Sequence, residues 1–311
     1  MNPGNQNNTG GRCLLSGGSG MLGKALREAL ANRGDEVIQL VRREPARQGE
    51  LRWDPEATSS PMAQPELLEG VTAAIHLSGS SVSGRRWTPA YREEMVTSRV
   101  HSTRALAKVL LALRKPPKVL LVASAIGFYG NRGDEILDEA SPAGTGFAPD
   151  MCLEWESAAG PAVEAGIRVV HLRFGVVLGA GEGALAQMVP PFRIGLGGRL
   201  GSGRQWMSWI GLADTTAAVL FAMENPTLAG PVNVTSPNPA TNAEFTRALA
   251  RQLKRPAFFA MPEVAVQMIF GQIARELLLA SLRVVPRKLV EAGFRFAHPG
   301  VDEALREALK R

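Results

Sequence analysis

Short hydrophobic runs alternate with longer amphipathic segments along most of the chain. The hydrophobic runs predict strands over residues 14–16, 36–41, 73–77, 119–124, 168–174 and 231–234. The amphipathic segments predict helices over residues 24–33, 88–114, 149–164, 212–224, 242–253, 264–270, 274–282 and 302–308. Alternation of this kind is typical of a parallel sheet covered by helices on both faces. We therefore expect an α/β fold, namely a Rossmann-type doubly wound parallel sheet with a smaller C-terminal α/β substrate lobe.

The chain changes character after residue 178, where glycines bracket short apolar pieces. We expect a disordered tail over residues 1–11 and a nucleotide-binding domain over 12–178, completed by residues 205–235. The small substrate lobe is predicted over residues 179–204 and 236–311. Ligands of such folds bind at the carboxyl ends of the strands, so this lobe would cap the site there.

A glycine pattern, Gly-x-x-Gly-x-x-Gly over residues 17–23, joins the first predicted strand to the first predicted helix. Gly17 permits a tight turn, Gly20 lets backbone amides approach a pyrophosphate, and Gly23 lets the helix pack closely on the sheet. A strand before the pattern, a helix after it and a second strand beyond make the pattern specific. It predicts a dinucleotide site; the alternative is a glycine-rich turn with no ligand.

Two arginines, Arg42 and Arg43, follow the second predicted strand, where a site specific for NAD usually carries an acidic residue. A guanidinium group matches phosphate oxygens in charge and geometry, so the pair predicts the 2′-phosphate of NADP(H). Ser19 could supply a hydroxyl to the same phosphate. The alternative is that both arginines are solvated charges.

Other predicted strand ends carry the remaining candidates. Ser124, at the tip of the central strand, is the first candidate for a catalytic hydrogen bond, and Tyr129 follows as a proton donor that could instead pack beside the cofactor. Arg86, Trp87 and Trp209 are candidate substrate contacts, with core packing as the alternative for Trp209. The predicted cofactor contacts are Gly17, Ser19, Gly20, Met21, Leu22, Gly23, Arg42, Arg43, Leu77, Ser78, Gly79, Arg99, Ser124 and Arg173.

Composition narrows the class of protein. The 311 residues are 45% hydrophobic and carry a net charge of +6, with acidic and basic residues interspersed, so we expect neither nucleic-acid binding nor a membrane partner. Two cysteines form no disulfide framework, which indicates a reducing, cytoplasmic location. Four histidines without ligand spacing predict no metal. A monomer or homodimer acting on a small molecule is the expectation.

Several segments together resemble a known family. Residues 16–23, 78–79, 124–130 and 172–179 resemble the extended short-chain dehydrogenase/reductase superfamily of the nucleotide-sugar epimerase type. A narrower resemblance, to its atypical "epimerase family", rests on the motifs RRWT (85–88), SRV (98–100), LEWE (153–156), GLGG (195–198), GSGRQ (201–205), SWI (208–210) and NVTSP (233–237). That family carries a C-terminal domain of unknown function, matched here by VPRKL (285–289) and AGF (292–294).

The resemblance covers residues 12–309 and implies NADP(H)-dependent oxidoreductase or epimerase chemistry on an unknown small molecule. The chain departs from the superfamily at its Tyr-x-x-x-Lys pair, because the two possible registers hold Phe147 with Met151 and Ala148 with Cys152. Neither register supplies the pair, since Phe cannot donate a proton and Met cannot carry a charge. Another acid must serve, or the chain is a non-catalytic NADP(H)-binding redox sensor or partner-binding protein.

Overall fold

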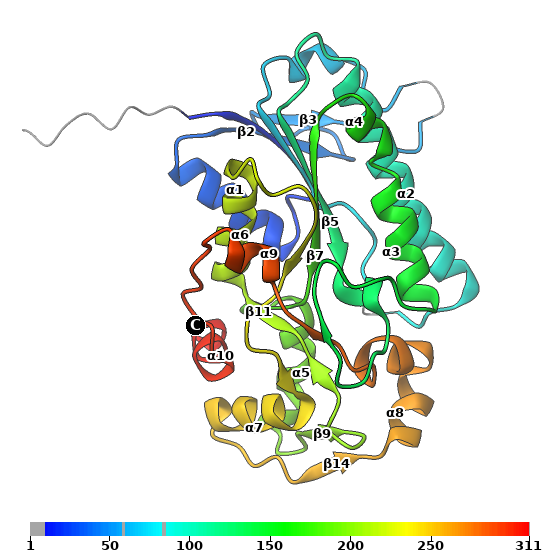
Figure 1. The fold of residues 1–311 in the computed structure, drawn as a ribbon, viewed down its shortest axis with the longest axis vertical. Helices are drawn as coiled ribbons and strands as arrows, with labels where there is room; N and C mark the ends of the chain where they lie inside the picture. The colour runs from blue at the N-terminus through cyan, green and yellow to red at the C-terminus, as the bar shows by residue number, and fades with distance from the viewer. Residues whose placement is uncertain (1–9, 58–59, 83–84, 311) are drawn as a thin grey trace, which may run out of the picture.

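A seven-stranded parallel sheet forms the centre of the protein, in the order β12-β7-β5-β4-β1-β2-β3 (Figure 1). The computed structural model describes residues 10–57, 60–82 and 85–310, so most of the expected tail lies outside the described residues. The strands are β1 Arg12–Ser16, β2 Glu36–Val41, β3 Glu50–Arg52, β4 Ala73–His76, β5 Val119–Ala125, β7 Arg168–Phe174 and β12 Gly230–Val234. The strand order reverses between β1 and β4, which opens a crevice at their carboxyl ends. The predicted fold is confirmed; the three-residue strand β3 was missed.

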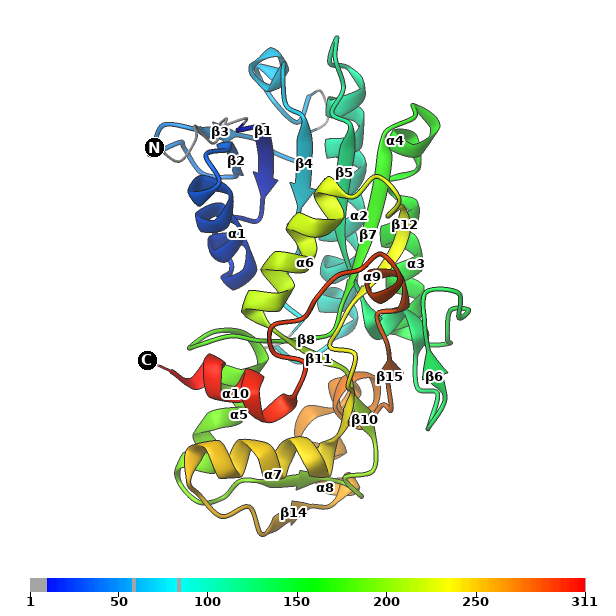
Figure 2. The same cartoon turned by 60° about the vertical axis from the view of Figure 1, so that its left-hand side comes forward.

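Helices cover both faces of the sheet (Figures 1 and 2). One face packs against α1 Met21–Asn32 and α6 Leu212–Glu224, and the other against α2 Pro89–Leu111, α3 Phe147–Ser157 and α4 Gly160–Glu164. Alternate strand residues enter the two cores: Leu14 belongs to one, and Cys13 and Leu15 belong to the other. The single helix predicted over residues 149–164 is wrong, since a break precedes Pro161 in the first turn of α4, where a missing N–H costs nothing.

A smaller lobe lies at the lower end of the molecule in Figures 1 and 2. Its elements are α5 Gly183–Arg193, β9 Gly198–Leu200, β10 Trp206–Met207, β13 Ala240–Thr241, α7 Asn242–Leu253, β14 Phe259–Met261, α8 Glu263–Phe270 and α10 Val301–Leu309. The helix predicted over 274–282 is instead a five-residue π-helical turn, Ala274–Leu278. Remaining short elements are β6 Ile136–Leu137, β8 Val176–Leu178, β11 Trp209–Gly211, β15 Arg283–Val284, α9 Arg287–Glu291 and the 3₁₀ turns Pro65–Leu68 and Ile126–Tyr129. Among the described helices, none is long and apolar enough to cross a membrane.

Candidate functional site

The turn after β1 contains two kinds of glycine. Gly17 and Gly23 are closely packed, whereas Gly20 faces open space. Gly17 has a φ of +74°, and a Cβ there would lie 2.7 Å from the carbonyl carbon of Leu77. A Cβ on Gly23 would lie 2.3 Å from the carbonyl oxygen of Gly17, so both positions require glycine. The nearest atom to a Cβ on Gly20 is 3.7 Å away. Gly20 also precedes α1 without a side-chain cap, which leaves the first N–H groups of the helix for an anion.

The other residues of this turn that were predicted to contact the cofactor are Ser19, Met21 and Leu22, and they differ in their surroundings. Ser19 is exposed beside Gly20. Leu22 packs against the core on the α1 side of the sheet. Met21 lies so close to Gly179 that its sulfur would be 2.3 Å from a Cβ there, which brings the segment after β8 over the glycine turn.

The two arginines after β2 have different surroundings. Arg43 donates two hydrogen bonds to the Glu50 carboxylate, at 2.8 and 2.7 Å, and holds the pKa of Glu50 down to about 2. Arg42 is exposed and makes no hydrogen bond or ion pair with any part of the chain that the structure describes. Arg42 is therefore the guanidinium free to receive a phosphate group, while Arg43 is held at the same strand end.

Arg99 lies behind the turn that follows β4. A Cβ on Gly79 would be 3.1 Å from its Cγ, and its guanidinium donates to the carbonyls of Met95 and Ser80, both at 2.9 Å. Burial lowers the pKa of Arg99, and its Nε has no hydrogen-bond partner. No carboxylate in the described ranges pairs with it, so the alternative of an ion pair with a glutamate of its own helix is wrong. A buried cation without a counter-ion beside a strand-end turn favours an anionic ligand nearby.

His76 is buried at the end of β4 and contacts the end of β1, next to the glycine turn. Its Nδ1 lies 2.6 Å from the Oγ of Ser16 and its Nε2 lies 3.1 Å from the Oγ of Ser102. Because Ser102 donates its own proton to the carbonyl of Ser98, His76 donates from Nε2 and accepts from Ser16. Complete burial lowers the pKa of His76 to about 3 and keeps the ring neutral. No role was predicted for His76 from the sequence, where the histidines were noted only for lacking metal-ligand spacing.

Ser124 and Arg173 point into the interior beneath α3, where both hydrogen-bond to Glu156; their contacts with the cofactor or substrate stay predictions. They are register partners on β5 and β7, with 2% and 3% of their surface exposed. Ser124 donates to the Oε1 of Glu156 at 2.7 Å, and Arg173 donates to both carboxylate oxygens of Glu156 at 2.8 Å. The side-chain hydrogen bonds of the three residues are satisfied within the protein.

Tyr129 continues this buried network and is fully enclosed, which favours the packing alternative; its role as a proton donor stays a prediction. Its hydroxyl donates to the Oδ1 of Asn233 at 2.7 Å and accepts from Arg173 at 3.0 Å. Burial raises the pKa of Tyr129 to about 12. The backbone N–H of Asn233 donates to Glu139, whose pKa is also raised by burial. We call Ser124, Glu156, Arg173, Tyr129 and Asn233 the polar row.

The register of the usual Tyr and Lys is filled by apolar packing. Phe147 and Met151 lie in a cluster with Trp87, Tyr91 and Met95, and the Phe147 ring centroid is 5.4 Å from that of Trp87. The indole of Trp87 donates to the carbonyl of Val82 at 2.9 Å. Neither residue at this register can donate a proton; the phenolic hydroxyl in the cluster belongs to Tyr91 and donates to the carbonyl of Ser81.

The predicted substrate residues do not all lie together. Trp87 is nearly buried in the cluster just described. Arg86 is exposed and donates to the carbonyls of Met268 and Ile269 at the end of α8, so it ties this loop to the small lobe. Trp209 is fully buried in the core of that lobe, which favours the packing alternative over substrate contact.

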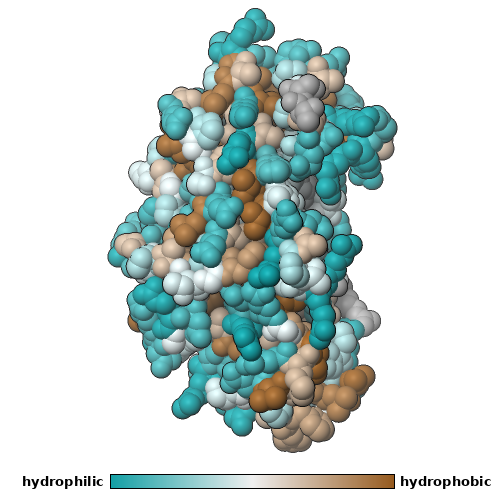
Figure 3. Space-filling model, turned by 90° about the vertical axis from the view of Figure 1, so that its right-hand side faces the viewer, coloured by the Kyte–Doolittle hydropathy of each residue, from teal (hydrophilic) through white to brown (hydrophobic). Residues whose placement is uncertain are grey.

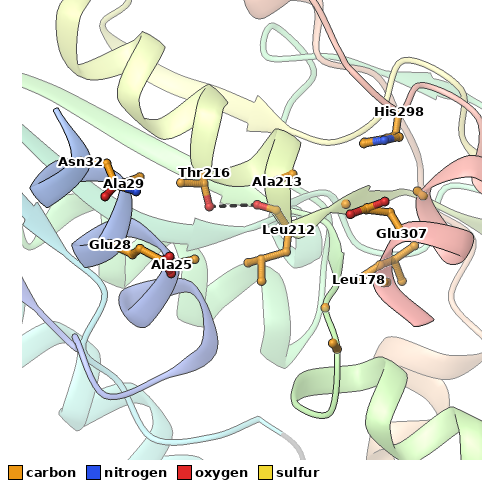
Figure 4. Close-up of a pocket in the computed structure, with 15 residues that line it drawn as sticks. Ala25, Glu28, Ala29, Asn32, Leu178, Leu212, Ala213, Thr216, His298 and Glu307 are labelled. Carbon is orange, nitrogen blue, oxygen red and sulfur yellow. Dashed lines mark hydrogen bonds between the residues drawn. The ribbon is translucent and has the colours of Figure 1, made fainter. Parts of the chain in front are cut away.

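Two cavities lie outside the predicted site residues. One, of about 400 Å³, is bounded by α1, α6 and α10, and Glu28, Thr216 and Glu307 lie around it (Figure 4). The other, of about 310 Å³, lies beside β2 and β3 and includes Arg47 and Glu50. Neither contains a residue of the glycine turn. No group of three or more potential metal ligands occurs in the described ranges.

Comparisons with known proteins show the family to which the chain belongs. Residues 13–235 match the NAD dependent epimerase/dehydratase family, and residues 261–308 match DUF1731, a domain of unknown function. The chain is 44% identical over 297 residues to "Epimerase family protein Mb2239" of Mycobacterium bovis, which covers 96% of this chain and 97% of that protein. It is 36% identical over 299 residues to "Epimerase family protein SDR39U1" of Homo sapiens, which covers 95% of this chain and 99% of that protein.

Comparison with solved structures supports the same family. The crystal structure of human SDR39U1 (isoform 2) with NADPH has a TM-score of 0.87 and 35% identity, and covers 96% of this chain and 98% of that one. UDP-glucose 4-epimerase of Thermotoga maritima, at 16% identity and a TM-score of 0.72, shares the fold. The chain therefore belongs to the NAD dependent epimerase/dehydratase family, as an epimerase family protein with a C-terminal DUF1731 domain.

Proposed function

We propose that this chain binds NADP(H) at the carboxyl ends of β1, β2 and β4. The observation that carries the proposal is the glycine turn, where Gly17 and Gly23 are enclosed while Gly20 faces open space at the start of α1. A pyrophosphate fits there because helix N–H groups and the helix dipole both favour an anion. The relative solved with NADPH supports the same choice of cofactor.

The phosphate group of NADP(H) would be recognised at the end of β2. Arg42 has a free guanidinium, and Arg43 is fixed by Glu50 at the same strand end. Each charge-assisted hydrogen bond to a phosphate favours NADP(H) over NAD(H), which lacks that group. Behind the next turn, Arg99 adds a buried positive charge that a cofactor phosphate would neutralise in part.

The proposed reaction is an oxidoreductase or epimerase step on a small molecule, with the cofactor supplying or accepting the hydride. The protein's part is to bind the nucleotide and to close the site with the small lobe, which Arg86 links to the loop after β4. Neither Ser124 nor Tyr129 carries the proton in this proposal, since both hydroxyls are enclosed in the polar row. A donor on the substrate or a solvent-exposed side chain takes that role.

A second candidate is an NADP(H)-binding protein without turnover, either a redox sensor or a partner-binding protein. One observation favours it: Phe147 and Met151 occupy the register of the usual catalytic pair and pack against Trp87. Both candidates require the same cofactor site, so binding is tested before chemistry.

The first experiment is calorimetric titration with NADPH and with NADH. We expect NADPH to bind more tightly, and Arg42→Ala to weaken NADPH at least about tenfold while leaving NADH nearly unchanged. Arg43→Ala tests the arginine that pairs with Glu50, and its effect on NADPH affinity is compared with that of Arg42→Ala. Arg104→Ala, exposed on α2, is the matched control and should bind both nucleotides like the parent protein.

Two outcomes decide the rest. If neither nucleotide binds, the glycine turn is structural and the proposal fails. If NADPH binds, a screen of carbonyl substrates at saturating NADPH detects a reductase, which oxidises NADPH with at least one of them. An epimerase returns the hydride to its substrate and consumes no NADPH, so a second screen follows the conversion of nucleotide sugars to their epimers with NADP⁺. A sensor is negative in both screens.

A further inference from the structure

Large apolar side chains lie exposed together at the end of the small lobe. Figure 1 places β9, β14 and α8 at this end of the molecule, and Figure 3 shows hydrophobic atoms gathered at the same end. We call this group the apolar tip. Its members are Ile194, Leu196, Phe258, Phe259, Val264, Met268 and Ile269.

The degree of exposure is high for side chains of this type. Phe258 is 90% exposed, Ile194 is 72% exposed and Met268 is 71% exposed. On α8 only Val266 is buried, so most of the apolar surface of this helix faces outward. Contiguous exposed apolar groups of this size mark an interaction site in folded proteins.

Basic side chains surround the apolar tip. Exposed Arg193 directly precedes Ile194, and exposed Lys254 and Arg255 lie just before Phe258. Strand pairing places Arg199 of β9 opposite Ala260, next to Phe259. Residues 183–204 and 240–282 together contain eight Lys or Arg and three Asp or Glu. The surface is therefore apolar in the middle with an excess of positive charge around it, and the exposed Glu263 at the start of α8 is an acidic residue within it.

The apolar side chains and the basic residues around them together indicate which kind of partner could bind the tip. In a symmetric dimer through the apolar tip, two positively charged lobes would face each other, and like charges at an interface are unfavourable. The tip is formed at one end of the molecule by a loop, a strand edge and one face of a helix (Figure 1). An anionic bilayer matches both features, because its interior takes apolar side chains while its headgroups attract Lys and Arg.

We propose that the apolar tip docks onto the surface of an anionic lipid bilayer. Val264, Met268 and Ile269 of α8 and the two phenylalanines of the β14 segment enter the interface, with Arg193, Arg199, Lys254 and Arg255 at headgroup level. The sequence argued against a membrane partner from the lack of a spanning segment, and that argument does not apply to docking at the surface. The proposal is independent of the cofactor.

The test is co-sedimentation of the whole chain with vesicles of phosphatidylcholine alone and of phosphatidylcholine mixed with phosphatidylglycerol. We expect binding to the mixed vesicles that weakens with added salt. Phe258→Ser with Met268→Ser should reduce partitioning at least about tenfold. Lys254→Asn with Arg255→Gln should reduce it about fivefold for each charge removed. Asn suits position 254, whose φ is 53°.

Val163→Ser is the matched control, because Val163 is a 55% exposed apolar side chain on α4. It should leave vesicle binding unchanged, and circular dichroism of every variant reports whether the fold is intact. Failure to bind either kind of vesicle overturns the proposal, as does an equal loss in the Val163→Ser control. If sedimentation velocity shows a dimer that Phe258→Ser with Met268→Ser abolishes, the occupant is a second copy and the proposal is wrong.

Discussion

The carboxyl edge of the sheet is built differently in its two halves. At β1, β2 and β4 the protein leaves groups unused: Gly20 faces open space, Arg42 has no partner among the described residues, and the Nε of Arg99 is unbonded. At β5, β7 and β12 the polar row uses nearly every group, with Glu156 accepting three hydrogen bonds from Ser124 and Arg173. Both halves lie where a ligand of this fold would bind.

The difference separates ligand sites from structural joints. Unused donors and open glycines indicate a place where a ligand completes the hydrogen bonding, since buried polar groups otherwise find partners within the protein. The polar row is complete already, and it attaches the C-terminal segment through Asn233, which donates to the carbonyl of Val285. Glu139 accepts from the backbone N–H of Asn233 and from that of Lys288, which adds a second link. Polar residues at a strand end therefore do not by themselves mark the active site.

Arg173→Met should produce the largest effect, because it leaves the Glu156 carboxylate buried without its cation. We expect the free energy of unfolding to fall by about 3–5 kcal/mol. Urea denaturation followed by circular dichroism measures this loss. The double variant Arg173→Met/Glu156→Leu should recover part of it, since replacing both charges removes the unpaired group.

The opposite result would show that the polar row is catalytic rather than structural. That outcome is a stable Arg173→Met protein that has lost NADPH-dependent turnover. It would return Ser124 and Tyr129 to the list of proton carriers.

The glycine turn is easier to recognise in the sequence than the polar row, for a physical reason. The glycine turn is local, because its three glycines satisfy backbone constraints within seven residues. The polar row joins Ser124, Arg173 and Asn233, which meet only through the register of β5, β7 and β12. The strand end drew attention to Ser124, but alternate residues face opposite sides of a sheet, and position 124 falls on the α3 side.

His76 gives the next largest effect, through pH. Burial lowers its pKa from 6.5 to about 3, so between these values the unfolded chain binds a proton that the folded chain does not. Stability is therefore full above about pH 6.5 and falls as the pH drops, by about 1.4 kcal/mol per unit, or about 2 kcal/mol at pH 5. His171 acts in the same direction, because its pKa is also lowered by burial. The measurement is the urea midpoint of the parent protein and of His76→Gln at several pH values. The difference between the slopes of the two plots of midpoint against pH is the contribution of His76.

Gly20→Ala should have the smallest effect on folding and the most specific effect on binding. Gly20 has a φ of −75° and its Cβ would meet no atom closer than 3.7 Å, so the free energy of unfolding should change by less than about 1 kcal/mol. The added methyl group would occupy the space proposed for the pyrophosphate, and NADPH affinity should fall at least about tenfold in calorimetry. Gly23→Ala is the matched comparison, since its Cβ would lie 2.3 Å from the carbonyl oxygen of Gly17 and should cost stability as well. If Gly20→Ala bound NADPH like the parent protein, the open glycine would not face the cofactor, and the distinction between the two halves of the edge would lose its main support.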